Sequence, residues 1–334
     1  MLVSWLIYSV QTHHSIMKNA ILYLLLVTVV SVTATFAQQF RSFHRTRKPP
    51  ASWCGVRKIT SRGLIVGGSE TIPGEWPWHA AVYHVTEGGR SREYKCGGTL
   101  INSGYLLTTA SCALYGRGKP EGAIVVELGQ FNLVESFAGK VDAIVSNVSI
   151  HEQYVHGETM NDVAVMQLKN AVQFTDYVQP ACLPVASENI EHYEGKNGTI
   201  VGWGFEQAGK LSEKLKTAQV PVISYLQCLK SDRDFFSRNL NSGMFCAGLL
   251  NGTAPCFGDA GGGMFFQNGK VWILRGIIAF TGRVYTETGG CNTEQYFGLV
   301  NVIHFMPWIE ETIARWNASI VPAVVQNKSQ QQRW

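Results

Sequence analysis

The sequence predicts an all-β protein made of antiparallel sheets, and three observations lead to this class. After residue 64 the chain consists largely of short runs rich in Val, Ile, Tyr and Thr, which Gly, Asn and Ser interrupt at regular intervals. This spacing favours antiparallel barrels over βαβ units. Apolar residues recur at clear helical spacing only near the carboxyl end, between Met306 and Trp316.

The expected elements follow one another along the chain. Strands are predicted at residues 80–84, 98–102, 105–109, 123–128, 143–150, 163–168, 199–203, 271–280 and 298–302. Met306-Pro307 opens the one expected helix, because proline is favoured in a first helical turn. Residues 317–334 are polar and contain several glutamines. We expect them to form a disordered tail.

The amino-terminal residues have the composition of a secretory signal peptide. Met17-Lys18-Asn19 precedes the apolar run 20–32, and Thr35-Phe36-Ala37 supplies the small residues that a signal peptidase reads. We therefore expect residues 1–37 to be removed, with 1–16 lying upstream of a possible true start at Met17. A membrane anchor is the weaker alternative, because the apolar run is shorter than the ~20 residues that a bilayer requires. The prediction is a secreted, extracellular protein with no membrane span.

Composition and charge narrow the function classes. The chain of 334 residues is 46% hydrophobic, so it can bury a full core, and its net charge of +4 is too small to indicate nucleic-acid binding. Residues 38–64 form a basic segment, in which a solvated arm is the main interpretation and a polyanion contact or a processing site is the alternative. The eight cysteines are an even number, as oxidising surroundings favour. No Cys-x-x-Cys pair occurs, so no metal site is expected.

One glycine-rich stretch organises the remaining motifs. Cys256-Phe257-Gly258-Asp259-Ala260-Gly261-Gly262-Gly263 describes a tight loop whose successive N–H groups can form an anion-binding nest. Further motifs are Leu64-Ile65-Val66-Gly67-Gly68, Leu106-Leu107-Thr108-Thr109-Ala110-Ser111-Cys112, Asn161-Asp162-Val163-Ala164-Val165-Met166, Val201-Gly202-Trp203-Gly204 and Met306-Pro307-Trp308-Ile309. In this order they resemble the landmarks of the trypsin-like serine proteases, which have the chymotrypsin fold.

The resemblance covers residues 65–316 and implies two six-stranded antiparallel β-barrels, a cleft between them and a C-terminal helix. It also implies how the cysteines pair, which the sequence alone leaves open. The implied disulfides are Cys54–Cys182, Cys96–Cys112, Cys228–Cys246 and Cys256–Cys291.

The catalytic positions depart from the family. In the family's mechanism a serine attacks, a histidine accepts its proton and an aspartate orients the histidine. The resemblance places Ser111 at the histidine position and Ala260 at the serine position, and only Asp162 matches. A serine hydroxyl is no base near neutral pH and a methyl group is no nucleophile. We expect Asp162 to have a structural role, with Ser111 as a possible hydrogen-bond donor to it.

Substrate recognition and activation are altered as well. Gly258 and Ala260 mark the remnant of the oxyanion loop, and Ala254 occupies the position where trypsin-type enzymes place an acid, so no preference for Arg or Lys is expected. The family cleaves before an Ile whose amine then pairs with an Asp, and Ile65 and Asp259 match these positions. The residue before Ile65 is Leu64, however, and the nearest basic residue is Arg62. A cut after Arg62 leaves Gly63 and Leu64 ahead of Ile65.

The sequence therefore predicts a secreted serine protease homologue without catalysis and without a cofactor. It resembles the insect homologues that bind proteases, zymogens or other components of extracellular cascades, such as innate immunity and melanisation. The alternatives are a serine-type hydrolase with displaced catalytic residues and a protein that recognises polyanions or microbial surfaces through the basic arm. Asn-x-Ser/Thr sequons predict N-glycosylation, and they occur at Asn147, Asn197, Asn251, Asn317 and Asn327.

Overall fold

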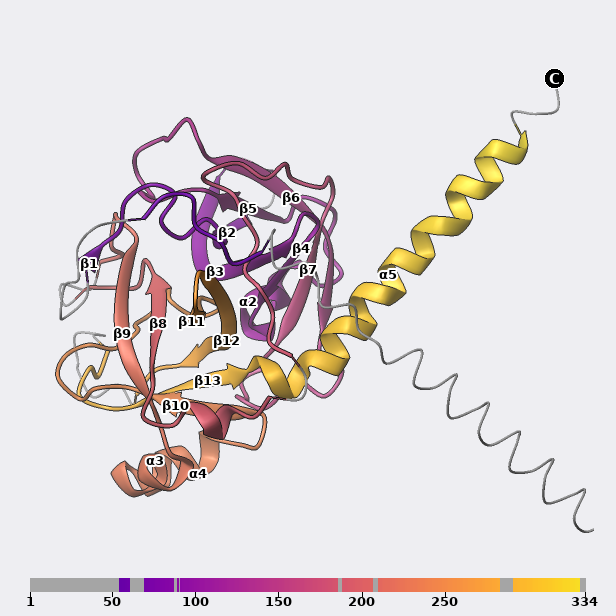
Figure 1. Cartoon of the computed structure of the whole chain (residues 1–334). Helices are drawn as coiled ribbons and strands as arrows, with labels where there is room; N and C mark the ends of the chain where they lie inside the picture. Colours follow the sequence, from indigo (N-terminus) through magenta and orange to yellow (C-terminus); the bar gives the residue numbers. More distant parts are fainter. Residues whose placement is uncertain are drawn as a thin grey trace, which may run out of the picture. The chain divides into compact units, whose positions relative to one another are not determined.

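The structure is a computed structural model that describes residues 54–60, 69–86, 89, 91–185, 188–206, 210–282 and 291–330, with side chains to residue 318 (Figure 1). Several predictions fall outside these residues. They are the signal peptide 1–37, most of the basic segment 38–64 with Arg62, the residue Ile65 and the side chain of Asn327.

The first barrel closes on itself through antiparallel pairs in the order β2-β3-β4-β7-β6-β5. Its strands are β2 (His79–Val85), β3 (Arg92–Asn102), β4 (Tyr105–Thr108), β5 (Ile124–Leu128), β6 (Val141–Ile150) and β7 (Ala164–Leu168). Apolar side chains such as Val82, Leu100, Leu106 and Val126 are fully buried in it. Their burial removes apolar surface from water at roughly 25 cal/mol per Å² and holds the barrel together.

The second barrel has the order β9-β10-β13-β12-β11-β8 and is closed by pairing of β8 with β9. Its strands are β8 (Asn197–Gly202), β9 (Lys216–Ile223), β10 (Met244–Ala247), β11 (Gly263–Asn268), β12 (Val271–Phe280) and β13 (Phe297–Asn301), and the short β1 (Ser69–Glu70) adds to β9. The predicted fold class is thus confirmed: two six-stranded antiparallel barrels followed by a helix.

The helix α5 (Val302–Gln330) directly follows β13, and it buries Ile309 and Thr312. The helical backbone continues past Asn317 to Gln330, whereas the composition of residues 317–334 predicts a disordered tail. The shorter helices are α2 (Ala110–Ala113), η1 (Leu114–Gly116), η2 (Ile190–Tyr193), α3 (Tyr225–Ser231) and α4 (Arg233–Asn239).

The four disulfides pair as the resemblance implies: Cys54–Cys182, Cys96–Cys112, Cys228–Cys246 and Cys256–Cys291. The first of them ties the segment 54–60 to the body across a sequence separation of 128 residues. Cross-links that close long loops restrict the unfolded chain most in the chain-entropy account. The disulfide therefore joins the segment 54–60 covalently to the rest of the protein at Cys182.

A side chain reinforces this attachment. The Arg57 guanidinium carbon lies 3.6 Å from the ring centroid of Trp76 and 4.0 Å from that of Trp272, and Nη1 lies 3.8 Å from Glu75 Oε1. Burial lowers the Arg57 pKa to about 10, which leaves the side chain charged at neutral pH. A desolvated cation held between two indole rings stabilises by about 2 kcal/mol. The segment 54–60 is thus held by the packing of Arg57 as well as by the Cys54–Cys182 disulfide.

We expect Arg57→Ala to lower the free energy of unfolding by about 2 kcal/mol, because the cation and its contacts with both indoles are lost. Lys58→Ala is the matched control, since its ion pair with Asp176 joins two exposed side chains, and such pairs contribute about 0–1 kcal/mol. Urea unfolding of both variants with the disulfides intact measures the difference. Equal stability of the two variants would contradict the proposed contribution of Arg57.

Candidate active site

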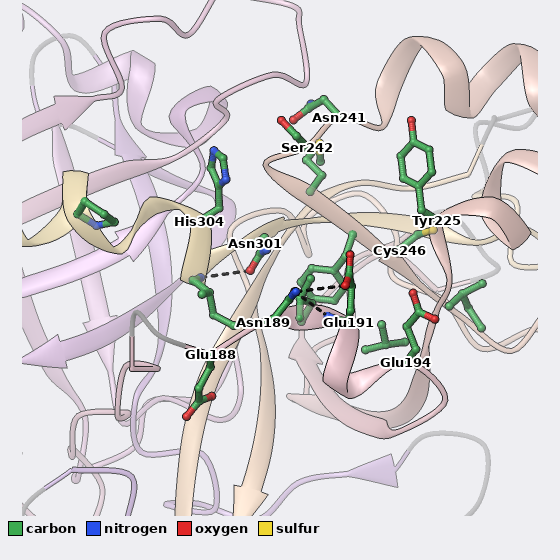
Figure 2. A pocket seen from close by; sticks show the side chains of 17 residues that line it. Glu188, Asn189, Glu191, Glu194, Tyr225, Asn241, Ser242, Cys246, Asn301 and His304 are labelled. Carbon is green, nitrogen blue, oxygen red and sulfur yellow. Dashed lines mark hydrogen bonds between the residues drawn. The ribbon is translucent and has the colours of Figure 1, made fainter.

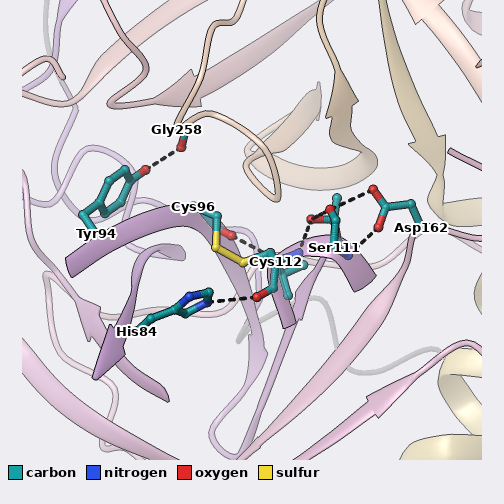
Figure 3. Close-up of a disulfide and its surroundings, with 10 residues drawn as sticks. His84, Tyr94, Cys96, Ser111, Cys112, Asp162 and Gly258 are labelled. Atoms are coloured by element: carbon teal, nitrogen blue, oxygen red, sulfur yellow. Dashed lines mark hydrogen bonds between the residues drawn. A yellow bond between two sulfur atoms is a disulfide. The ribbon is translucent and has the colours of Figure 1, made fainter. Parts of the chain in front are cut away.

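Ser111 and Asp162 are brought together at the start of α2, as Figure 3 shows. Thr109 caps this helix, its Oγ1 accepting the Cys112 N–H at 3.3 Å. The Ser111 N–H donates to Asp162 Oδ1 at 2.7 Å, and Ser111 Oγ lies 3.0 Å from Asp162 Oδ2. The expected hydrogen bond between the two side chains is therefore present.

Asp162 is held in a nearly dry environment. Its residue is only 4% exposed, and this burial raises the pKa of its carboxyl to about 6, against the stabilising hydrogen bonds from Ser111 and the Ala110 N–H. A carboxylate at this position can orient a proton-carrying group. With a hydroxyl as its partner, it has no imidazole to orient.

The loop around Ala260 keeps a shape that glycine permits. Gly258 has a φ of 96° and Gly261 a φ of 80°, and a side chain on Gly261 would meet the Gly97 carbonyl and the Thr108 hydroxyl. The Gly97 N–H donates to the Ala260 carbonyl at 2.8 Å. Tyr94 Oη donates to the Gly258 carbonyl at 2.7 Å (Figure 3). Contacts from the first barrel thus fix this loop of the second.

The remnant oxyanion loop retains its donors. Among the described residues, the N–H groups of Gly258 and Ala260 have no hydrogen-bond acceptor. Two unpaired N–H groups in one loop form a site that favours an anion or a polarised carbonyl oxygen. The family resemblance places the attacking oxygen at position 260, where this chain has the methyl group of Ala260.

Asp259, the expected partner of a new amino terminus, accepts the Gly204 N–H at 2.7 Å and the Cys256 N–H at 2.9 Å. Side chains on Gly202 or Gly204 would collide with its carboxylate, which explains the glycines there. Burial raises the Asp259 pKa to about 6. No cation contacts this carboxylate within the described part of the chain, to which Ile65 does not belong.

Three described histidines, His79, His84 and His151, lie outside the pair formed by Ser111 and Asp162. His79 is 1% exposed, and neither ring nitrogen has a hydrogen-bond partner among the described residues. The Nε2 atom of His84 lies 3.1 Å from the Cys112 carbonyl (Figure 3). The ring of His84 stacks on that of Tyr115. The ring of His151 contacts Trp308 and Phe305. A displaced base needs a positioned hydroxyl nucleophile, and none of these rings has one.

The specificity region is apolar. Ala254 packs against a buried cluster that includes Phe245, Met264 and Phe297. The ring of Phe280 covers Gly298, where any side chain would collide with it. The lack of preference for a substrate Arg or Lys that Ala254 implies stays a prediction.

A cavity of about 610 Å³ lies on the second barrel, and Phe245 of the apolar cluster also lines it (Figure 2). Acidic side chains from Glu188, Glu191 and Glu194 line it, and its opposite wall includes Tyr225 and His304. No sequence pattern predicts this cavity, because its walls come from segments far apart in the chain. Within the described residues, no group of His, Cys, Asp or Glu side chains is arranged to hold a metal ion.

Comparison with known proteins identifies the family to which this fold belongs. The trypsin family matches residues 65–309. The chain belongs to the trypsin family. Similar members are the proclotting enzyme of Tachypleus tridentatus (30% identical over 269 residues, 77% of this chain and 68% of that protein) and venom serine protease Bi-VSP of Bombus ignitus (33% over 241 residues, 70% and 64%). Another is coagulation factor XI of Bos taurus (32% over 263 residues, 76% and 38%).

The chain thus spans about two thirds of the first two trypsin-family relatives and 38% of the third. Within the described residues, no helix has both the length and the apolarity that crossing a bilayer requires. The family of this chain is therefore established. Membership of the family does not by itself show that the chain has the activity of any of these relatives.

Proposed function

We propose that this chain is a secreted, non-catalytic member of the trypsin family that acts by binding other proteins. The observation that carries the proposal is the pair Ser111 and Ala260, which stand where the chemistry needs a proton acceptor and an attacking oxygen. Loss of either group alone costs about a million-fold in turnover in subtilisin, an unrelated enzyme with the same chemistry. A trypsin-like fold that lacks both groups can still bind other proteins.

The site geometry supports this proposal. The hydrogen bonds from Ser111 to Asp162 occupy the carboxylate that would orient a histidine. The two barrels and four disulfides nevertheless keep the surface loops on a rigid scaffold. Loops on such a scaffold can bind partners without chemistry. The fold is thus retained for recognition.

The partners that we propose are proteases, zymogens or other components of an extracellular cascade, such as one in innate immunity or melanisation. The names of two relatives, a proclotting enzyme and coagulation factor XI, support a cascade setting. The disulfides support an oxidising, extracellular compartment.

A fluorophosphonate probe tests the absence of catalysis. We expect no stoichiometric labelling of the purified chain and no turnover of peptide esters, before or after exposure to a protease that cuts at Arg62. Active trypsin serves as the positive control. Labelling at one probe per chain would overturn the proposal and favour the hydrolase with displaced residues.

Binding is tested separately. Pull-down from the native fluid is expected to enrich trypsin-family proteases or their zymogens over a tagged, unrelated secreted protein. Retention on heparin, compared with a chain lacking residues 38–50, tests the polyanion alternative. Capture of no protease together with heparin binding that depends on these residues would replace the proposed partner class.

A further inference from the structure

A second cavity, of about 440 Å³, lies on the second barrel and combines aromatic rings with side-chain amides. Its lining includes Tyr193, Asn197, Gln219, Gln267, Asn268 and Trp272. Pockets that hold small polar ligands have apolar walls with a few placed polar groups. Asn197 differs from the others in this set because it is the acceptor asparagine of the sequon Asn197-Gly198-Thr199.

Among the sequon asparagines whose side chains the structure describes, Asn197 is the one that makes no side-chain hydrogen bond. Asn147 Nδ2 donates to Gln167 Oε1 at 2.8 Å, Asn251 Oδ1 accepts the Thr253 N–H at 3.2 Å, and Asn317 Oδ1 accepts from Tyr105 Oη at 2.8 Å. The Asn197 side chain has no hydrogen bond among the described residues, and it is exposed as the first residue of β8. A sugar attached there displaces no hydrogen bond of the asparagine side chain.

The aromatic wall beside Asn197 is held rigidly. The Arg275 guanidinium carbon lies 4.0 Å from the ring centroid of Tyr193, and the ring of Phe266 meets Tyr193 edge-on at 4.9 Å. Arg275 is 2% exposed and pairs with Glu188, whose Oε2 also accepts from Tyr193 Oη at 3.4 Å. A fixed ring presents apolar surface to a ligand without losing much conformational entropy on contact.

From the cavity and the sequon we propose that Asn197 carries an N-linked glycan whose first N-acetylglucosamine lies in this cavity. The apolar C–H face of the sugar packs on the aromatic wall of Tyr193 and Trp272. The amides of Gln219, Gln267 and Asn268 are placed to pair with its hydroxyl and acetamido groups. The glycan therefore stabilises the second barrel, and partners must bind to another face of the chain.

The test uses the full chain secreted from a eukaryotic host. Glycopeptide mass spectrometry is expected to find Asn197 occupied in most molecules. Three forms are then compared by thermal unfolding: the intact glycan, the glycan trimmed to one N-acetylglucosamine by an endoglycosidase, and Asn197→Gln. We expect the trimmed form to unfold at the same temperature as the intact form and Asn197→Gln to unfold about 3 °C lower.

Two variants make this result specific. Asn251→Gln, at a sequon in an exposed loop, is the matched control and should leave the unfolding temperature unchanged. Tyr193→Ala should remove most of the difference between the trimmed form and its own Asn197→Gln counterpart, because the wall under the sugar is gone. An unoccupied Asn197 would overturn the proposal. An occupied Asn197 with equal unfolding temperatures in all three forms would overturn the seating of the sugar.

Discussion

Restoring both missing catalytic groups in a correctly cut chain is expected to raise the rate of fluorophosphonate labelling about a thousand-fold or more over either single replacement. The variant combines Ser111→His, Ala260→Ser and Leu64→Arg, and trypsin then cuts it directly before Ile65. The reason is that the groups act as a unit: a base without a nucleophile, or the reverse, has little effect. Asp162 already lies where an imidazole at position 111 needs its acceptor.

The replacement at position 64 isolates the activation step. Without Leu64→Arg, cleavage at Arg62 leaves two residues ahead of Ile65, so its amine does not reach the buried Asp259 carboxylate in the usual way. We therefore expect the double replacement Ser111→His and Ala260→Ser, cut at Arg62, to label at least about a hundred times more slowly than the triple one. Labelling time courses on both proteins give the ratio. Equal rates would show that the junction is no barrier to activation.

The sequence predicted the parts of this fold that have local signals. Runs rich in β-branched residues located most strands of the first barrel, and the order of the motifs implied the disulfides. Two of the missed strands have contrary local signals. β9 (Lys216–Ile223) contains Pro221, which argues against a paired strand, and β11 (Gly263–Asn268) begins within the glycine-rich loop. α3 and α4 were missed because they are short, although Ser224 and Asp232 cap them.

Contacts between residues that lie far apart in the sequence mostly had no such local signal. The contact of Ser111 with Asp162 was foreseen, because both positions belong to recognisable motifs. The packing of Arg57 between Trp76 and Trp272 was not, since each of the three residues comes from a different part of the chain. The same holds for His79, whose ring lies 4.9 Å from that of Trp203. Periodicity reports which face of a strand is buried, but not which side chain it meets.

This buried histidine is expected to make the protein sensitive to acid. Burial lowers the His79 pKa to about 3, so the folded state leaves the ring neutral where the unfolded chain, with a pKa of 6.5, protonates it. The stability that this difference contributes is present above pH 6.5 and is lost as the pH falls toward 3. The loss is about 1.4 kcal/mol per pH unit in this window. At pH 4 it amounts to about 3 kcal/mol.

Asp162 and Asp259 act in the opposite direction. Their pKa values are raised to about 6 from 3.8, so the stability linked to their protonation is present below pH 3.8 and is lost as the pH rises through 6. The pH dependence of the native chain alone therefore mixes the contributions of the histidine and the carboxylates. Replacing the histidine separates them, because the two carboxylates are common to both proteins.

We expect His79→Leu to be at least as stable as the native chain at pH 7, since it removes a buried ring whose nitrogens lack partners among the described residues. At pH 4 its advantage should be about 3 kcal/mol larger than at pH 7, because leucine has no proton to bind. Urea unfolding at both pH values, with the disulfides intact, measures this change. His192→Leu, which makes the same replacement at an exposed histidine, is the matched control. A pH-independent effect of His79→Leu would show that the ring is already charged, or reached by water, in the folded protein.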